Sequence, residues 1–303
     1  MVTQQSLTTA APSLSSQFSH HLSLLTSRSD SQRRDSLSYL TTVVAARPVN
    51  TPLQQPVSVI LPSLLPLLLD GNNNVRSQLL KLLRSLPPND VEDHVSQLLL
   101  YIRAGMTHLA ADIRSSSIDV LGWVLEIAGQ ELVSCAGGWV KTLKCFLAML
   151  GWPNEVMAAA WSTSKASFGK GSSEGKVLVK NLNILASFLR TGLVPVDESQ
   201  DPTLVSKFPL WHVQYQLLPR RSNCYAHLNL FGPPRDEESE VYEDREARQR
   251  VFHARFQRAI ETALEADKRE GGEVGRAAAS VKKVLVEGMD GFEQEEDIWI
   301  CAG

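Results

Sequence analysis

The chain has 303 residues, a hydrophobic content of 43% and a formal net charge of -3. This length suits one extended helical array or two compact domains, and the near-neutral charge gives no general indication of nucleic-acid or membrane binding. The most apolar stretch, residues 57–69, is too short to cross a bilayer, so no membrane association is predicted.

Leucine-rich segments with helical spacing dominate residues 18–190, and strand-like alternation is scarce. Short polar connections separate these segments, which makes neighbouring helices antiparallel. We expect a flexible segment over 1–15, helical repeats over 16–191 and a loop-rich packing segment over 192–235. The predicted helices of the repeat region are 16–27, 30–46, 56–69, 73–86, 90–104, 112–128, 131–150, 154–167 and 175–191.

An internal repeat underlies these helices. Its clearest copy is LPSLLPLLLDGNNNVRSQLLKLLRSL at 61–86, and weaker copies are THLAADIRSSSIDVLGWVLE at 107–126 and SDSQRRDSLSYLTTVV at 29–44. Aligning Arg33, Arg76 and Arg114 gives spacings of 43 and 38 residues, which fit the period of HEAT and armadillo units. The sequence therefore predicts an all-α, HEAT/armadillo-type right-handed α-solenoid, in which stacked helix pairs share one core.

The turn inside each repeat carries an acid and an arginine. An aspartate there can accept backbone N–H groups at the next helix start, and an arginine can reach the acid of a neighbouring repeat. We predict such a structural ladder from Asp70, Arg76, Asp112 and Arg114; an ordinary solvated turn is the alternative. The inter-helix core is predicted to include Leu79, Leu80, Leu83, Ile118, Leu121 and Leu125.

The C-terminal part, residues 236–303, differs in composition. It carries a net charge of -8 and follows the Pro-containing linker GPPRDEESE at 232–240. Helices are predicted over 239–269 and 274–287, before an acidic end. We expect a charged helical arm whose apolar stripe is covered either by the rest of the chain or by a docking partner; an isolated solvated helix is the alternative. The stripe consists of Val251, Phe252, Phe256, Ile260 and Leu264.

Signatures of catalysis and of cofactor or metal binding are missing from the sequence. GKGSSEGK at 169–176 departs from the phosphate-loop pattern at Lys170 and Val177, so a flexible loop is predicted there. The pair His20 and His21 lies on different helix faces, and the four cysteines form no CxxC motif. We predict no enzymatic activity, no cofactor, no metal and no small-molecule substrate.

One part of the sequence is more specific than a generic helical repeat. The segment NDVEDHVSQLLLYIRAGMTHLAADIRSSSIDVLGWVLEIAG, followed by GGWVKTLKCFLAMLGW, spans residues 89–152, and LTTAAPSLSSQFSHHLSLL lies near the beginning of the chain. These segments resemble the Ipi family of pre-rRNA-processing proteins, the HEAT/armadillo subunit of the Rix complex, similar to the animal testis-expressed protein ten.

The resemblance implies a non-catalytic scaffold in large ribosomal subunit biogenesis, needed to process internal transcribed spacer two. It implies the Rix subunit, the WD-repeat Ipi subunit, a midasin-type AAA ATPase and the pre-60S particle as partners, and a location in the nucleoplasm and nucleolus. Two alternatives stay open. One is direct RNA binding, including pre-rRNA, through residues 101–235, which carry a net charge of +4; the other is a cargo-carrying helical-repeat adaptor.

Overall fold

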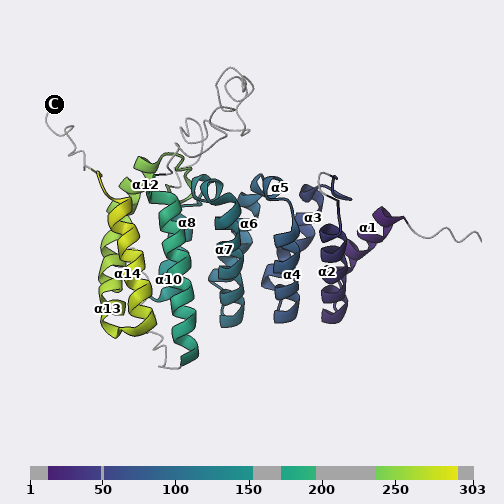
Figure 1. The fold of residues 1–303 in the computed structure, drawn as a ribbon, viewed down its shortest axis with the longest axis horizontal. Helices are drawn as coiled ribbons and strands as arrows, with labels where there is room; N and C mark the ends of the chain where they lie inside the picture. Colours follow the sequence, from purple (N-terminus) through teal and green to yellow (C-terminus); the bar gives the residue numbers. More distant parts are fainter. Residues whose placement is uncertain (1–12, 49–50, 153–171, 196–236, 293–303) are drawn as a thin grey trace, which may run out of the picture. The chain divides into compact units, whose positions relative to one another are not determined.

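The computed structural model describes residues 13–48, 51–152, 172–195 and 237–292, and all regular secondary structure within these ranges is helical (Figure 1). The prediction of an all-α chain is confirmed for this part of the molecule. The chain divides into two compact units, Met1–Val120 and Leu121–Gly303. The boundary falls inside helix α7, which spans Ala111–Ser134.

Unit 1 alternates helices with short turns. Helix α2 packs side by side with α4, and α1 packs against α2 (Figure 1). The elements of unit 1 before α7 are α1 (Leu14–Leu24), α2 (Asp30–Ala45), α3 (Val57–Leu64), η1 (Leu65–Leu69), α4 (Asn73–Ser85), α5 (Pro88–Glu92) and α6 (Val95–Met106).

Local sequence explains where these helices begin and tighten. The side chains of Ser13 and Asn72 cap α1 and α4, each by accepting a backbone N–H of the first turn. The predicted helix 56–69 changes at residue 65 into the 3-10 segment η1, with Pro66 in its first turn. The predicted helix 90–104 is likewise two helices, α5 and α6, separated by a short turn.

The core of unit 1 comes from apolar residues at helical spacing. Among the residues predicted for the core, Leu79, Leu83 and Ile118 are buried, and Leu121, the first residue of unit 2, is buried as well. Leu80 and Leu125 are only half-buried, so the predicted helix phase is slightly off for these two. Further fully buried side chains of unit 1 include Phe18, Leu37, Leu40, Ile60, Leu61 and Leu64.

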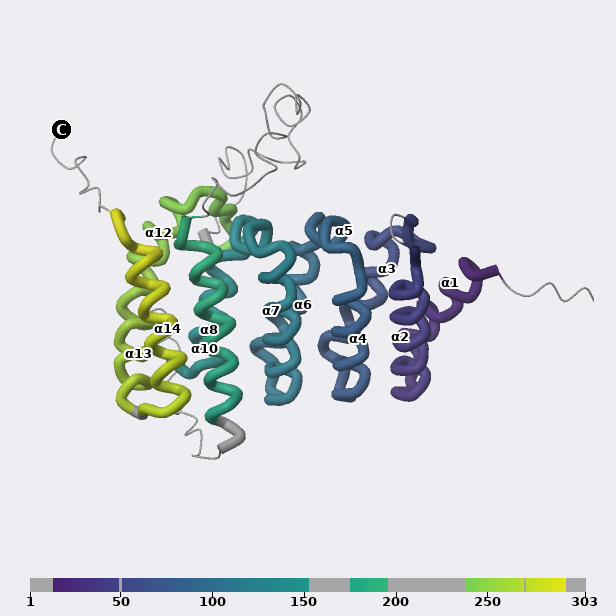
Figure 2. Tube along the Cα trace, in the orientation of Figure 1, coloured from purple at the N-terminus to yellow at the C-terminus, as the bar shows by residue number. Residues whose placement is uncertain are grey.

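Unit 2 is built around α10, which packs against α14, while α13 and α14 form an antiparallel pair (Figure 2). Besides the end of α7, its described elements are α8 (Val140–Leu150), α10 (Ser172–Leu193), η4 (Glu237–Ser239), α12 (Arg245–Phe252), η5 (His253–Gln257), α13 (Arg258–Glu270) and α14 (Gly272–Gly288). The predicted helices 175–191 and 274–287 lie within α10 and α14. The predicted helix 154–167 lies outside the described residues.

Two predicted helices of unit 2 are wrong in extent. The prediction of one helix over 131–150 fails because the chain turns between α7 and α8, where Gly137 has a φ of 68°. The predicted helix 239–269 instead begins at Arg245, after the irregular residues 240–244. It then includes a π-helical turn, η5, between α12 and α13.

Trp139 is the centre of the core of unit 2. Its ring is fully buried and stacks on Phe188 of α10, with ring centroids 5.0 Å apart. Gly192 allows this close approach, because a Cβ there would lie 2.2 Å from the indole ring. The indole Nε1 donates to the carbonyl of Arg248 at 3.1 Å, which ties α12 to this core.

Candidate functional site

An arginine recurs four residues after the cap of three helices in unit 1. The backbone N–H groups of Arg33, Arg76 and Arg114 donate to the carbonyls of residues 29, 72 and 110, at 3.1–3.2 Å. Each guanidinium then donates from Nη1 to the carbonyl six residues before it, at 2.8, 2.5 and 2.8 Å. The same side chain thus holds each inter-helix turn against the helix that follows it.

The first of these arginines also reaches the next repeat. Arg33 Nε lies 2.8 Å from Asp70 Oδ2, and Arg33 Nη2 donates to Asp70 Oδ1 at 3.1 Å. Asp70 additionally accepts the backbone N–H of Asn72 at 2.8 Å, and its side chain is only 6% exposed. The hydrogen bond that Arg33 donates to Asp70, together with the negative charge of Asp70, raises the pKa of Arg33.

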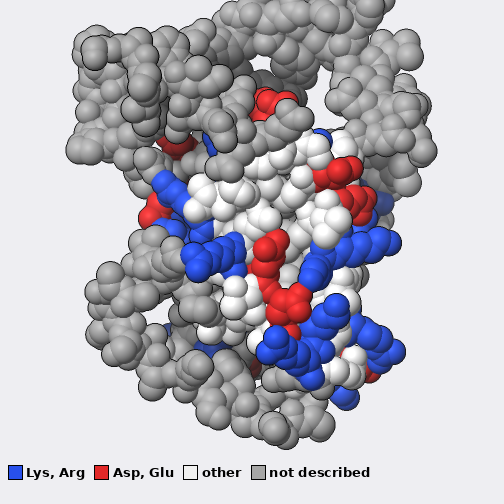
Figure 3. Space-filling view, turned by 90° about the vertical axis from the view of Figure 1, so that its left-hand side faces the viewer, with Lys and Arg blue, Asp and Glu red and all other residues white. Residues whose placement is uncertain are grey.

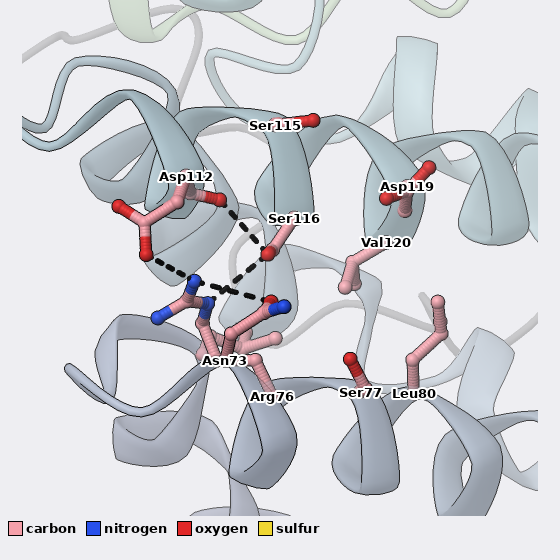
Figure 4. Close-up of a pocket in the computed structure, with 10 residues that line it drawn as sticks. Asn73, Arg76, Ser77, Leu80, Asp112, Ser115, Ser116, Asp119 and Val120 are labelled. Carbon is pink, nitrogen blue, oxygen red and sulfur yellow. Dashed lines mark hydrogen bonds and ion pairs between the residues drawn. The ribbon is translucent and has the colours of Figure 1, made fainter.

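Arg76 makes the corresponding link to the repeat after it. Its Nη2 lies 2.6 Å from Asp112 Oδ2, and its Nε donates to Ser116 Oγ at 3.0 Å (Figure 4). Arg76 is almost fully buried, whereas the Asp112 side chain is 56% exposed. The hydrogen bond from Arg76 lowers the pKa of Asp112 and keeps this carboxylate ionised.

A hollow of about 350 Å³ lies beside this second ion pair, between α4 and α7 (Figure 4). Most of its lining residues have polar side chains, and Leu80 and Val120 form part of its apolar wall. No metal-ligand set of three His, Cys, Asp or Glu side chains occurs here or elsewhere in the described residues. The arrangement suits mechanical coupling of successive repeats. The polar lining comes from Asn73, Arg76, Ser77, Asp112, Ser115, Ser116 and Asp119.

The structure places the four predicted turn residues unequally. Asp70, Arg76 and Asp112 take part in ion pairs between successive repeats of unit 1. Arg114 instead donates to the carbonyls of His108 and Leu109 within its own turn. Arg33, which marks the first repeat in the sequence, supplies the partner of Asp70.

Unit 2 contains a fourth arginine of the same kind, which the sequence analysis missed. Arg248 donates its backbone N–H to the carbonyl of Asp244, four residues earlier, and its Nη1 to the carbonyls of Tyr242 and Glu243, both at 2.7 Å. Its Nε donates to the carbonyl of Gly192 at 2.8 Å, at the end of α10. The guanidinium is buried, and this burial lowers the pKa of Arg248. The spacing from Asp244 to Arg248 equals that from Asn72 to Arg76, so the sequence held a signal for it.

The apolar stripe proposed for partner docking lies inside unit 2. Phe252, Phe256, Ile260 and Leu264 are at most 2% exposed, and Val251 is half-buried. Phe252 lies 6.3 Å from Trp139 between ring centroids. This burial favours coverage by the chain's own helices, which was one of the two forms of the prediction.

The structure also places the histidine pair, the cysteines and the segment 169–176 that stand out in the sequence. His21 lies against Tyr39 with ring centroids 3.9 Å apart, and the buried Cys135 donates from Sγ to the carbonyl of Leu132 at 3.3 Å. The flexible loop predicted at 169–176 is wrong for residues 172–176, which form the beginning of α10, and residues 169–171 lie outside the described part of the chain. No helix of the described part is long and apolar enough to span a membrane.

Comparison with known proteins identifies the relatives of this chain. Residues 89–189 match the family model of the Ipi1 N-terminal domain, described as "Rix1 complex component involved in 60S ribosome maturation". The pre-rRNA-processing protein ipi1 of Aspergillus fumigatus is 56% identical over 94% of this chain and 85% of that protein. The protein of the same name from Sclerotinia sclerotiorum is 54% identical over 98% of this chain and 87% of its own length.

A chain of a solved Rix1-Rea1 pre-60S particle also aligns with this one, with a TM-score of 0.48 and 20% identity. The alignment covers 71% of this chain and 80% of that chain. The assignment itself stands on the sequence relatives, whose identity extends over nearly the whole chain. The chain belongs to the Ipi1 family of pre-rRNA-processing proteins.

Proposed function

We propose that this chain is a non-catalytic scaffold of the Rix1 complex, formed by a right-handed HEAT/armadillo-type solenoid. Membership of the Ipi1 family places its function in pre-rRNA processing, as a Rix1 complex component in 60S ribosome maturation. The observation that carries the scaffold proposal is the pair of ion-pair links, Arg33–Asp70 and Arg76–Asp112. They join successive helix pairs, as expected of a stacked array that offers long surfaces to partners.

The finer parts of the proposal follow from the family. The partners are the Rix subunit, the WD-repeat Ipi subunit, a midasin-type AAA ATPase and the pre-60S particle. The processed region is internal transcribed spacer two, and the protein works in the nucleoplasm and nucleolus. The all-helical secondary structure of the described residues fits this role.

The proposal is tested by gradual depletion in a fungal host, because a scaffold acts in proportion to its amount. The chain is placed under a titratable promoter, tagged, and purified under mild conditions at several expression levels. We expect the Rix subunit, the WD-repeat subunit and pre-60S proteins to co-purify, and spacer-containing precursors to rise as the chain falls. An unchanged precursor level at one-tenth of the chain would point to a catalytic or dispensable role.

Direct RNA contact is the competing function, supported by the net charge of +4 over residues 101–235. It is separated from scaffolding by ultraviolet cross-linking in the same cells and by binding of the pure chain to precursor RNA across a salt series. A phosphate-binding surface gives an affinity that falls steeply with salt. Retention of the partner proteins after nuclease treatment, with no cross-linked RNA, supports the scaffold.

A further inference from the structure

A second hollow lies on the outer side of the antiparallel pair α13 and α14. It has a volume of about 490 Å³, and its lining is almost entirely aliphatic. Ala279 is exposed, and Val286 is 67% exposed, so its isopropyl group is bare to solvent. Around this apolar floor stand Lys268, Lys282, Lys283 and Glu287.

Positive charge on the rim of this hollow is only partly compensated. Lys282 pairs with Glu265, and the acid of the rim, Glu287, lies 3.9 Å from Arg190. Lys268 and Lys283 are exposed and have no ion-pair partner within the described residues. Figure 3 shows Lys and Arg side chains on both sides of a small acidic group on this end face of unit 2. The hollow therefore suits an acidic segment that carries a large apolar side chain.

The chain itself contains such a segment directly after α14. Residues 293–303 read EQEEDIWICAG, with four acidic residues, no basic residue and the apolar triplet Ile298, Trp299 and Ile300. An extended chain covers about 3.3 Å per residue, so the seven residues from 293 to 299 can span about 23 Å. Counted back from Gly288, where α14 ends, Val286, Lys283 and Ala279 lie about 3, 8 and 14 Å along the helix, at 1.5 Å per residue. The segment from 293 to 299 is thus long enough for Trp299 to reach Val286.

We propose that residues 293–303 dock onto the hollow of α13 and α14, with Trp299 on Val286 and the acidic run beside Lys268 and Lys283. Attachment to α14 keeps this segment at a high effective concentration, so a modest contact suffices to hold it. The docked segment covers the bare apolar surface at the end of unit 2. It also blocks this face to other acidic segments.

The test is zero-length carbodiimide cross-linking of the full chain, which joins carboxylates to lysine amines in direct contact. Cross-links from the four acids of 293–297 are mapped by mass spectrometry. Mixing isotope-labelled with unlabelled chain separates links within a molecule from links between molecules. We expect links within one molecule to Lys268 and Lys283, and none to Lys81 of α4, which is also exposed.

Two variants probe the apolar contact without removing a linkable group. Val286→Ser and Trp299→Ala should each lower the Lys268 and Lys283 links about fivefold, because a large apolar side chain loses its burial. Val59→Ser, at an exposed valine of α3, is the matched control and should leave them unchanged. Absence of the links, links that persist in both variants, or links only between molecules would each overturn the proposal.

Discussion

At the scale of single residues, the same arginine position recurs where a helix begins. Arg33, Arg76, Arg114 and Arg248 each satisfy carbonyl groups of the turn that precedes them. Such carbonyls are costly when they are buried without a partner. The repeated side chain therefore stabilises the turn whether or not an acid of the next repeat is within reach, as Arg114 and Arg248 show.

Replacing Arg248 by methionine should destabilise unit 2 strongly. The change leaves the carbonyls of Gly192, Tyr242 and Glu243 without their donor, at a cost of about 1–3 kcal/mol for a buried unpaired group. We expect the free energy of unfolding to fall by about 3 kcal/mol in urea titrations, since several such groups are affected. Arg250→Met, two residues away and exposed, is the control and should change stability little. Equal stability of the two variants would contradict the structural role of Arg248.

His21 should give α1 and α2 a pH-dependent stability. Burial, and then the charge of His20, lower the pKa of His21 in the folded state. The unfolded chain therefore binds a proton more readily, and stability is lost as the pH falls below the ordinary histidine pKa of 6.5. The melting temperature should drop more for the parent protein than for His21→Gln between about pH 7.5 and about pH 5.5, on either side of the usual histidine pKa. The control variant His94→Gln should show the same fall in melting temperature as the parent protein. If His21→Gln showed that fall as well, His21 would not be its source.

The sequence predicted part of this residue-scale picture. Asp70, Arg76 and Asp112 could be named because two copies of the repeat align around them. Arg248 could not be named in this way, because the surrounding REARQR sequence is typical of a solvated helix. Only its spacing from Asp244 matches the other turns. Its burial depends on the end of α10, which lies 56 residues earlier in the chain.

At the scale of elements, periodicity placed most helices well, and glycines and long-range packing decided the errors. The predicted helix 131–150 ignored the pair Gly137 and Gly138, although Gly137 takes a φ that other residues avoid. The predicted helix 239–269 started too early, because residues 240–244 are irregular and contact the turn between α7 and α8 instead of forming a helix. One such contact is the carbonyl of Glu240, which accepts the N–H of Gly137.

The two ends of α10 provide a matched pair of glycine substitutions. Gly175→Ala meets nothing within 4 Å and should raise stability by up to about 1 kcal/mol, the usual gain in a helix interior. Gly192→Ala places its Cβ 2.2 Å from the ring of Trp139 and should lower stability by about 1–3 kcal/mol through overpacking. Both are measured by thermal and urea unfolding. The same sign for both changes would show that Trp139 does not pack on Gly192.

At the scale of the whole molecule, the C-terminal helices are part of a core rather than an appendage. The acidic charge and the Pro-containing linker of the sequence favour an arm, but sequence patterns alone do not show that α14 packs along α10. Helix α14 contributes the buried residues Val281, Val284 and Leu285, and α10 contributes Leu185 and Phe188.

Removing residues 237–303 should therefore unfold much of unit 2. Its loss bares the apolar face of α10, and each large buried side chain contributes about 1.5–3 kcal/mol. We expect the truncated chain to lose helical circular dichroism beyond the share of the deleted residues and to bind the Rix subunit poorly. A chain ending after Phe292 is the control, and should keep the melting temperature of the core. Full helicity and partner recovery after the larger deletion would refute the integral role of these helices.

The position of Trp139 has a spectroscopic consequence. All six tryptophans of the chain lie at or beyond residue 123, so unit 1 contains none. Indole emission therefore reports on unit 2 alone. The ring of Trp139 stacks on Phe188, so its emission should shift strongly to the red when unit 2 unfolds. Helical ellipticity records both units. Superimposable emission and ellipticity curves would mark a single cooperative transition, whereas separated midpoints would mark two independently melting bodies.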